Sequence, residues 1–325
     1  MSCVKAQAWI AAIVLEAVLL TGSSNGTASS TAWIVFAASP QHGTQPSQLF
    51  RITTTGEGLN QITTGVRAAT EPAFSPDGTR VAFTRAFSGI FVMRANGTRL
   101  TRLTDGGDDH FPVWAPDGTR IAFLRPTASS PTKGGSFKLF VMNANGRRQH
   151  VLRLAPHPAG RPSWLPGGKS IVISSKGSFY EVNASNGKVK RHFGPTYDAT
   201  NGAPFWTLAP NGRTIAVIGP RPGPGGCEGV ACEVSALYLL RFGATLQRWF
   251  ADDSGLAGWS PDSRTLVFAR GGTLNLQAAS GGPAKVLAVG EPERPSGRCS
   301  ARLATVGLQA TASDNAPKEP DAEQS

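Results

Sequence analysis

The most regular feature of the sequence is a short pattern of apolar run, turn and apolar run that recurs five times. In the first copy, Phe74 precedes the turn Ser75–Gly78 (Ser-Pro-Asp-Gly), and the apolar run Val81–Phe83 follows it. Pro at the second and Gly at the fourth position are typical of a type I turn, so the pattern predicts two strands joined there. The five copies read PAFSPDGTRVAF (72–83), PVWAPDGTRIAF (112–123), PSWLPGGKSIVI (162–173), WTLAPNGRTIAVI (206–218) and AGWSPDSRTLVF (257–268).

Each copy continues with two more predicted strands. The third strand is an apolar run such as 89–93 or 138–142, and an Asn-Gly pair such as Asn96–Gly97 follows it as a hairpin signal before the fourth strand. The turn prolines stand 40, 50, 44 and 51 residues apart. Four antiparallel strands repeated at this period predict the blades of a β-propeller.

The first unit is incomplete, because residues 33–64 match only strands two to four. We therefore predict an all-β, six-bladed β-propeller of four-stranded antiparallel blades, closed by N- and C-terminal strands in one blade, because an open blade would leave unpaired edges. Residues 302–308 are the candidate for the missing strand, and residues 27–31 are the alternative. In the fourth copy Leu208 takes the aromatic position and Trp206 lies two residues earlier, which allows a shifted first strand.

The chain divides into three predicted segments. In residues 1–28, Lys5, an apolar run at 6–20 and a stretch of small residues have the order of a secretory signal peptide, with an uncleaved N-terminal anchor as the alternative. Residues 29–312 form the propeller, and residues 313–325 are expected to be an acidic disordered tail. The expected location is extracytoplasmic, meaning secreted, periplasmic or associated with the cell envelope, with no membrane span in the mature chain.

Charge and cysteines narrow the possibilities further. The formal net charge is +11, but the basic residues are scattered through the turns, so we expect no nucleic-acid partner. Cys227 and Cys232 form a C-x4-C pair, which predicts a local disulfide, and a bridge from Cys299 to the same loop is the alternative. No further ligands complete a metal site at that spacing, so we predict no metal and no cofactor.

The repeat, with its Phe or Trp, Ser-Pro-Asp-Gly turn and Leu-Phe-Val-Met type of third strand, resembles the TolB-type β-propeller family of bacterial envelope proteins. The resemblance covers residues 33 to about 290 and implies the fold more than a function. Only about 30 residues precede the first strand, which leaves no room for the N-terminal domain of TolB itself, so a role in the Tol system is not expected. Related propellers precede peptidase domains, but no segment of that size follows here.

Chain direction places the candidate binding residues. Connections between strands two and three, and from one blade to the next, lie on one rim and vary most in length, which is where function usually resides. The alternative for each residue there is an ordinary solvated position. Seven residues at the blade entrances are expected near the mouth of the central channel: Glu71, His110, Phe111, Arg161, Tyr197, Asp198 and Asp252.

Signals for catalysis and metal binding are incomplete. The motif G-x-S-x-G at 22–26 lies in the predicted signal segment and lacks its partners. Asp105, Asp108 and Asp109 lie close together, but their spacing departs from that of a calcium loop. We therefore expect a monomeric, exported, non-enzymatic module or scaffold that binds a protein or peptide through its variable rim. The alternatives are a propeller hydrolase or lyase acting on peptide or glycan, and an envelope protein that binds an anionic polymer.

Overall fold

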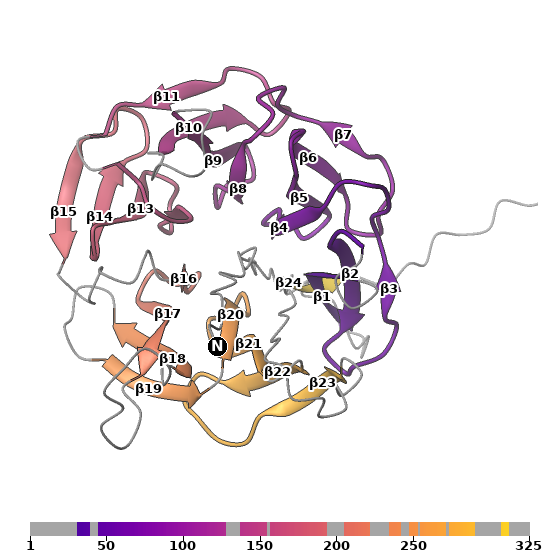
Figure 1. Ribbon diagram of the computed structural model, residues 1–325. Helices are drawn as coiled ribbons and strands as arrows, with labels where there is room; N and C mark the ends of the chain where they lie inside the picture. Colours follow the sequence, from indigo (N-terminus) through magenta and orange to yellow (C-terminus); the bar gives the residue numbers. More distant parts are fainter. Residues whose placement is uncertain are drawn as a thin grey trace, which may run out of the picture.

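The computed structural model describes residues 31–39, 45–127, 137–154, 157–193, 205–221, 234–241, 247–252, 254–270, 273–289 and 307–311. Within these ranges the regular structure is β-strand, arranged in six four-stranded antiparallel sheets. The sheets stand around a ring, with their outer strands on the perimeter (Figure 1). The predicted all-β, six-bladed propeller is confirmed. The predicted signal segment and acidic tail lie outside the described residues.

Each sheet is one blade, and its strands run in order from the inside of the ring outward. The first blade contains β24 (Gly307–Thr311), β1 (Thr31–Ala38), β2 (Gln48–Thr53) and β3 (Asn60–Gln61), and the second contains β4 (Ala69–Phe74), β5 (Arg80–Arg85), β6 (Gly89–Arg94) and β7 (Thr101–Arg102). The third contains β8 (His110–Trp114), β9 (Arg120–Pro126), β10 (Phe137–Asn143) and β11 (His150–Leu152), and the fourth contains β12 (Ser163–Trp164), β13 (Ser170–Ser175), β14 (Ser178–Asn183) and β15 (Val189–Phe193). The fifth contains β16 (Phe205–Leu208), β17 (Thr214–Arg221), β18 (Val234–Arg241) and β19 (Gln247–Asp252), and the sixth contains β20 (Ser254–Trp259), β21 (Thr265–Arg270), β22 (Thr273–Ala278) and β23 (Lys285–Val289).

The two predicted kinds of tight turn lie on the same face of the ring. Between β4 and β5, the N–H of Gly78 donates to the carbonyl of Ser75 at 2.7 Å, and between β6 and β7 the N–H of Gly97 donates to the carbonyl of Arg94 at 2.9 Å. We call this side the turn face. The opposite side carries the connections between strands two and three and between blades, and we call it the loop face.

In three of the five copies, a tryptophan before the turn fastens its blade to the preceding one. The indole of Trp114 in β8 is buried and donates a hydrogen bond of 3.1 Å to the carbonyl of Ala73 in β4. The guanidinium of Arg80, from the preceding blade, lies 4.5 Å from the same ring. The hydrogen bond recurs in two later copies, in which Trp164 donates to the carbonyl of Val113 at 3.2 Å and Trp259 donates to the carbonyl of Thr207 at 3.3 Å. The repeated aromatic is therefore a link between blades.

The fourth copy keeps the register of the others. Leu208 pairs with Ile215, seven residues later, as Trp114 pairs with Ile121 in the second copy. A shift of the first strand, which the sequence allowed, does not occur. Trp206 instead packs edge-on against Phe179 of the preceding blade and donates its indole hydrogen bond to the buried Ser174 hydroxyl at 3.0 Å. A different position on the strand thus supplies the link between blades here.

The first blade combines strands from two distant parts of the chain. β24 pairs antiparallel with β1, with Thr31 opposite Thr311 and Val35 opposite Gly307. β24 shares residues 307 and 308 with the predicted segment 302–308 and continues to Thr311. Residues 302–306 lie outside the described residues. β1 is the second strand of its sheet, so its first residue lies at the turn face. Whether this pairing stabilises the ring remains a prediction.

The core consists of the inner three strands of each blade and the contacts between neighbouring blades. One apolar cluster, for example, joins Val172 and Phe179 of one blade to Trp206 and Leu208 of the next. The outer strands are mostly exposed, as in β15. None of the described segments is a helix long and apolar enough to cross a membrane.

Candidate functional site

The sequence-predicted site residues fall into three groups. Glu71, His110 and Phe111 lie on the innermost strands β4 and β8, and Arg161 lies just before β12 and is buried. Asp252 is the last residue of the outer strand β19, and its side chain is not described. Four other predicted residues lie outside the described residues: Tyr197, Asp198, Cys227 and Cys232. The alternative disulfide partner, Cys299, also lies outside them.

Glu71 connects two blades. It lies in a β-bulge of β4, where the pairing with β5 shifts between Thr70 and Ala73, and its backbone is left-handed at φ 57°. A bulge re-aims a side chain, and this one points the carboxylate toward the next blade. The residue is only 4% exposed. One carboxylate oxygen, Oε2, accepts hydrogen bonds from the Thr84 hydroxyl at 2.5 Å and from the Phe111 backbone N–H at 2.7 Å.

Phe111 repeats the conformation of Glu71 one blade later. Its φ is 54°, and the pairing of β8 with β9 shifts between His110 and Val113. Its side chain packs against the apolar clusters on both sides of its blade. Non-glycine residues in this region cost of order 1 kcal/mol or more, so the two bulges persist because the contacts around them fix the backbone. Both residues hold the blade entrances in place.

His110 lies among carboxylates at the loop face. Its Nδ1 lies 3.4 Å from Oε1 of Glu71, and its Nε2 lies 3.5 Å from Oδ1 of Asp108. Burial alone would lower the pKa of His110, but the hydrogen bond and charge of Glu71, with the charges of Asp108 and Asp109, raise that pKa to about 9. The imidazole is therefore a cation at neutral pH, and its ring forms a T-shaped pair with the ring of Phe137, with the centroids 6.2 Å apart.

Asp109 forms a salt bridge with Arg125. The side chain is completely buried, and its two oxygens accept hydrogen bonds from Nε and Nη2 of Arg125 at 2.6 and 2.8 Å. The hydrogen bond with Asp109 raises the pKa of Arg125, although burial opposes it. Across the described ranges, no group of three or more His, Cys, Asp or Glu side chains has an arrangement that could hold a metal ion. The aspartates of this loop therefore divide into buried Asp109 and exposed Asp105 and Asp108.

Two exposed apolar side chains lie on the loop face beside this cluster, and sequence reasoning missed them. Phe87, in the turn between β5 and β6, is 75% exposed and has a left-handed backbone at φ 55°. Val66, in the connection from β3 to β4, is 94% exposed. The prediction concentrated on long loops, and the β5–β6 turn is short. The available signal was an aromatic residue inside a polar turn, in the run Arg-Ala-Phe-Ser-Gly (85–89).

Hydrogen bonds fasten these two loops to each other. Nη1 of Arg67 donates to the carbonyl of Phe87 at 2.9 Å, and Nη1 of Arg85 donates to the carbonyl of Thr64 at 3.2 Å. The next loop along is also close, since a Cβ on Gly107 would lie 3.7 Å from the Phe87 carbonyl oxygen. The loop face therefore carries one continuous strip, from Val66 and Phe87 to Asp108 and His110. We call it the rim strip.

Comparisons with known proteins bear on the fold. No family model and no curated protein matches the sequence. Among solved structures, TolB from Acinetobacter baumannii superposes with a TM-score of 0.56 at 18% identity, over 77% of this chain and 62% of that one. A putative TolB from Agrobacterium tumefaciens gives the same TM-score at 14% identity, over 80% of this chain and 90% of that one.

The fold is that of the TolB propeller. The chain spans less than two thirds of the length of the Acinetobacter TolB, so the likeness is to its propeller part. Propellers from proteins of other kinds are also similar, including an oligogalacturonate lyase from Vibrio parahaemolyticus and the tricorn protease, with TM-scores of 0.50 and 0.52 at 10% and 11% identity. These cover 76% and 81% of this chain, and 72% and 30% of theirs. A TolB-like fold therefore leaves the function open.

Proposed function

We propose that this TolB-like propeller is an exported, monomeric, non-enzymatic module that binds a segment of a protein or peptide along the rim strip. The observation that supports it most directly is Phe87, an aromatic side chain held out into solvent by a left-handed backbone. A bulky residue with positive φ is uncommon, and among the described non-glycine residues in this conformation Phe87 is the one aromatic residue whose side chain is exposed.

The surroundings of Phe87 fit a binding role. Its exposed neighbour Val66 adds apolar surface, and Arg67 and Arg85 hold both loops by hydrogen bonds to backbone carbonyls. A rigid aromatic anchor loses little conformational entropy on binding, which is why aromatic residues dominate binding energy in protein interfaces. Exposed Asp105 and Asp108 supply hydrogen-bond acceptors at the other end of the rim strip. The ligand we propose is an extended peptide segment with an apolar side chain to place over Phe87.

A test begins by selecting peptides from a displayed random library against the full chain, and then measures their affinity by fluorescence anisotropy. The variant Phe87→Ala with Val66→Ser removes the apolar end of the rim strip and changes no buried contact. The matched control is Leu100→Ala with Val286→Ser, which removes two exposed apolar side chains outside the loop face.

We expect the rim variant to weaken the selected peptides at least tenfold and the control to leave them within a factor of two. Thermal melting should show both variants folded. Equal loss in both variants, or no loss in the rim variant, would place binding elsewhere and contradict the proposal.

A further inference from the structure

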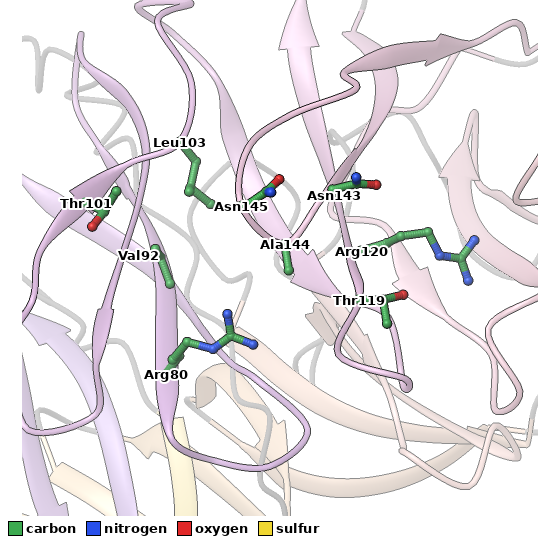
Figure 2. A pocket seen from close by; sticks show the side chains of 9 residues that line it. All are labelled: Arg80, Val92, Thr101, Leu103, Thr119, Arg120, Asn143, Ala144 and Asn145. Carbon is green, nitrogen blue, oxygen red and sulfur yellow. The ribbon is translucent and has the colours of Figure 1, made fainter.

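A second candidate site lies on the turn face, away from the rim strip. A groove of about 600 Å³ separates the blade of β4–β7 from the blade of β8–β11. Its apolar lining comes from Val92 and Leu103 on one side and Ala144 on the other. Polar groups line the rest of it, and Figure 2 shows the side chain of Arg80 extending from its strand into the space between the blades.

The guanidinium of Arg80 is held in position but has hydrogen-bonding capacity to spare. Its Cζ atom lies over the ring of Trp114, 4.5 Å from the centroid, and this contact limits its motion. Asp77 attracts it electrostatically, but that carboxylate accepts hydrogen bonds from Ser75 and Thr79. Within the described ranges the guanidinium of Arg80 forms no hydrogen bond and no ion pair. A planar donor fork fixed in this way is suited to a carboxylate.

The next copy of the repeat has an arginine at the same position, with different partners. Arg120 holds the same position one blade later and lies 4.8 Å from the ring of Trp164. Its Nη2, however, donates to Asp117 at 3.2 Å and to the carbonyl of Gly168 at 2.8 Å. Arg120 completes a contact between turns, whereas Arg80 keeps its donors directed into the groove. The difference is local and does not follow from the repeat.

The rest of the lining indicates the kind of anion. Asn143 and Asn145 bring amide groups, which can both donate to and accept from a peptide backbone. The apolar floor offers contact to a neighbouring side chain. The groove lining contains no acidic side chain. We propose that this groove is a binding site for an acidic peptide segment, with a glutamate or aspartate carboxylate on the Arg80 fork and an apolar neighbour against Val92 and Leu103.

A highly charged polymer fits these observations less well. Polyphosphate or a sulfated glycan needs cations at regular intervals, and its affinity depends on total charge. Here the lining includes two arginines, of which Arg120 already donates to Asp117 and to the Gly168 carbonyl. The other polar side chains are neutral: Thr101, Thr119, Asn143 and Asn145. The shape of the site, as well as its charge, should therefore control binding.

The experiment uses the full chain and an acetylated, amidated tetrapeptide of alternating glutamate and leucine, with a glutamine-leucine peptide as its neutral counterpart. Isothermal titration would compare the native protein with Arg80→Gln, Arg80→Lys and Ala144→Leu. The last variant fills the groove without altering its charge. Arg213→Gln is the matched control, because it removes one exposed arginine from the corresponding turn of another blade.

We expect Arg80→Gln and Ala144→Leu each to weaken the acidic peptide about tenfold, with Arg80→Lys between them and the native protein. Arg213→Gln should change affinity less than twofold, and the neutral peptide should not bind. If Arg80→Gln fails to fold, Ala144→Leu still decides the matter. Unchanged affinity in Ala144→Leu, or equal loss in Arg80→Gln and Arg213→Gln, would overturn the proposal in favour of diffuse attraction to polyanions, which polyphosphate binding would then show. Absence of binding by the native protein would overturn it outright.

Discussion

The link between blades at Trp114 offers a quantitative test of what holds the ring together. Trp114→Phe is a substitution that the repeat itself contains, because Phe74 holds the same position one blade earlier. Trp114 is 2% exposed. The change removes the hydrogen bond to the Ala73 carbonyl, which contributes about 0.5–1.5 kcal/mol. It also weakens the stacking with Arg80, which contributes about 0.5–1 kcal/mol, and leaves a small cavity that costs about 1 kcal/mol more.

We therefore expect Trp114→Phe to lower the free energy of unfolding by about 2–3 kcal/mol. Urea denaturation followed by circular dichroism would measure it, with an unchanged slope against urea showing that the extent of unfolding is the same. The control is Trp33→Phe. Trp33 is half-buried and has the same stacking, with Arg51 at 4.4 Å, but its indole forms no hydrogen bond within the described ranges. Equal losses in the two variants, or a loss below about 1 kcal/mol at Trp114, would refute the reasoning.

Three other predictions concern strain, charge and ring closure. Ser263 has φ 61° where other copies have glycine, and its hydroxyl accepts a 3.0 Å hydrogen bond from the N–H of Asn211. Ser263→Ala should lower the free energy of unfolding by about 1 kcal/mol, whereas Ser263→Gly should be nearly neutral because relief of strain offsets the lost bond; equal values in urea denaturation would contradict this. The pKa of His110 is raised from 6.5 to about 9, so its stabilising charge is fully present below pH 6.5 and lost as pH rises through about 9. The difference in melting temperature between the native protein and His110→Gln should therefore shrink toward zero at high pH, and a difference that stays constant across pH would be contrary evidence. In Glu71→Gln, NMR titration should find the pKa of the His110 imidazole lower than in the native protein. Deleting residues from 307 onward removes β24 and exposes the edge of β1, so the melting temperature should fall, and an unchanged value would show that the pairing adds nothing to stability.

The sequence predicted the blades well because their determinants are local. A Ser-Pro-Asp-Gly turn and an Asn-Gly turn each specify their own backbone, and five copies in register leave little choice of fold. The ends of the strands were less certain. The inner strand β24 has no turn motif of its own, and its register depends on pairing with β1 at the other end of the chain, as between Thr31 and Thr311.

The candidate site was predicted only in part, because it depends on contacts between blades. Glu71 and His110 do come together at the predicted blade entrances, but the Glu71 carboxylate is buried and joins two blades. No sequence pattern indicates that burial. Phe87 likewise lies in a short turn, and its exposure becomes visible only once the neighbouring loops are in place. Its role in binding stays a prediction until the peptide measurements are made.

The pairing of Thr31 with Thr311 also determines how the molecule can be held. The start of β1 and the end of β24 lie together at the turn face. A tether, a fusion partner or a solid support that is attached at either strand end would therefore hold the propeller from that side. The loop face is then presented outward whichever end is used. A receptor immobilised in this way would display the rim strip to the medium, while the groove beside Arg80 would remain close to the support.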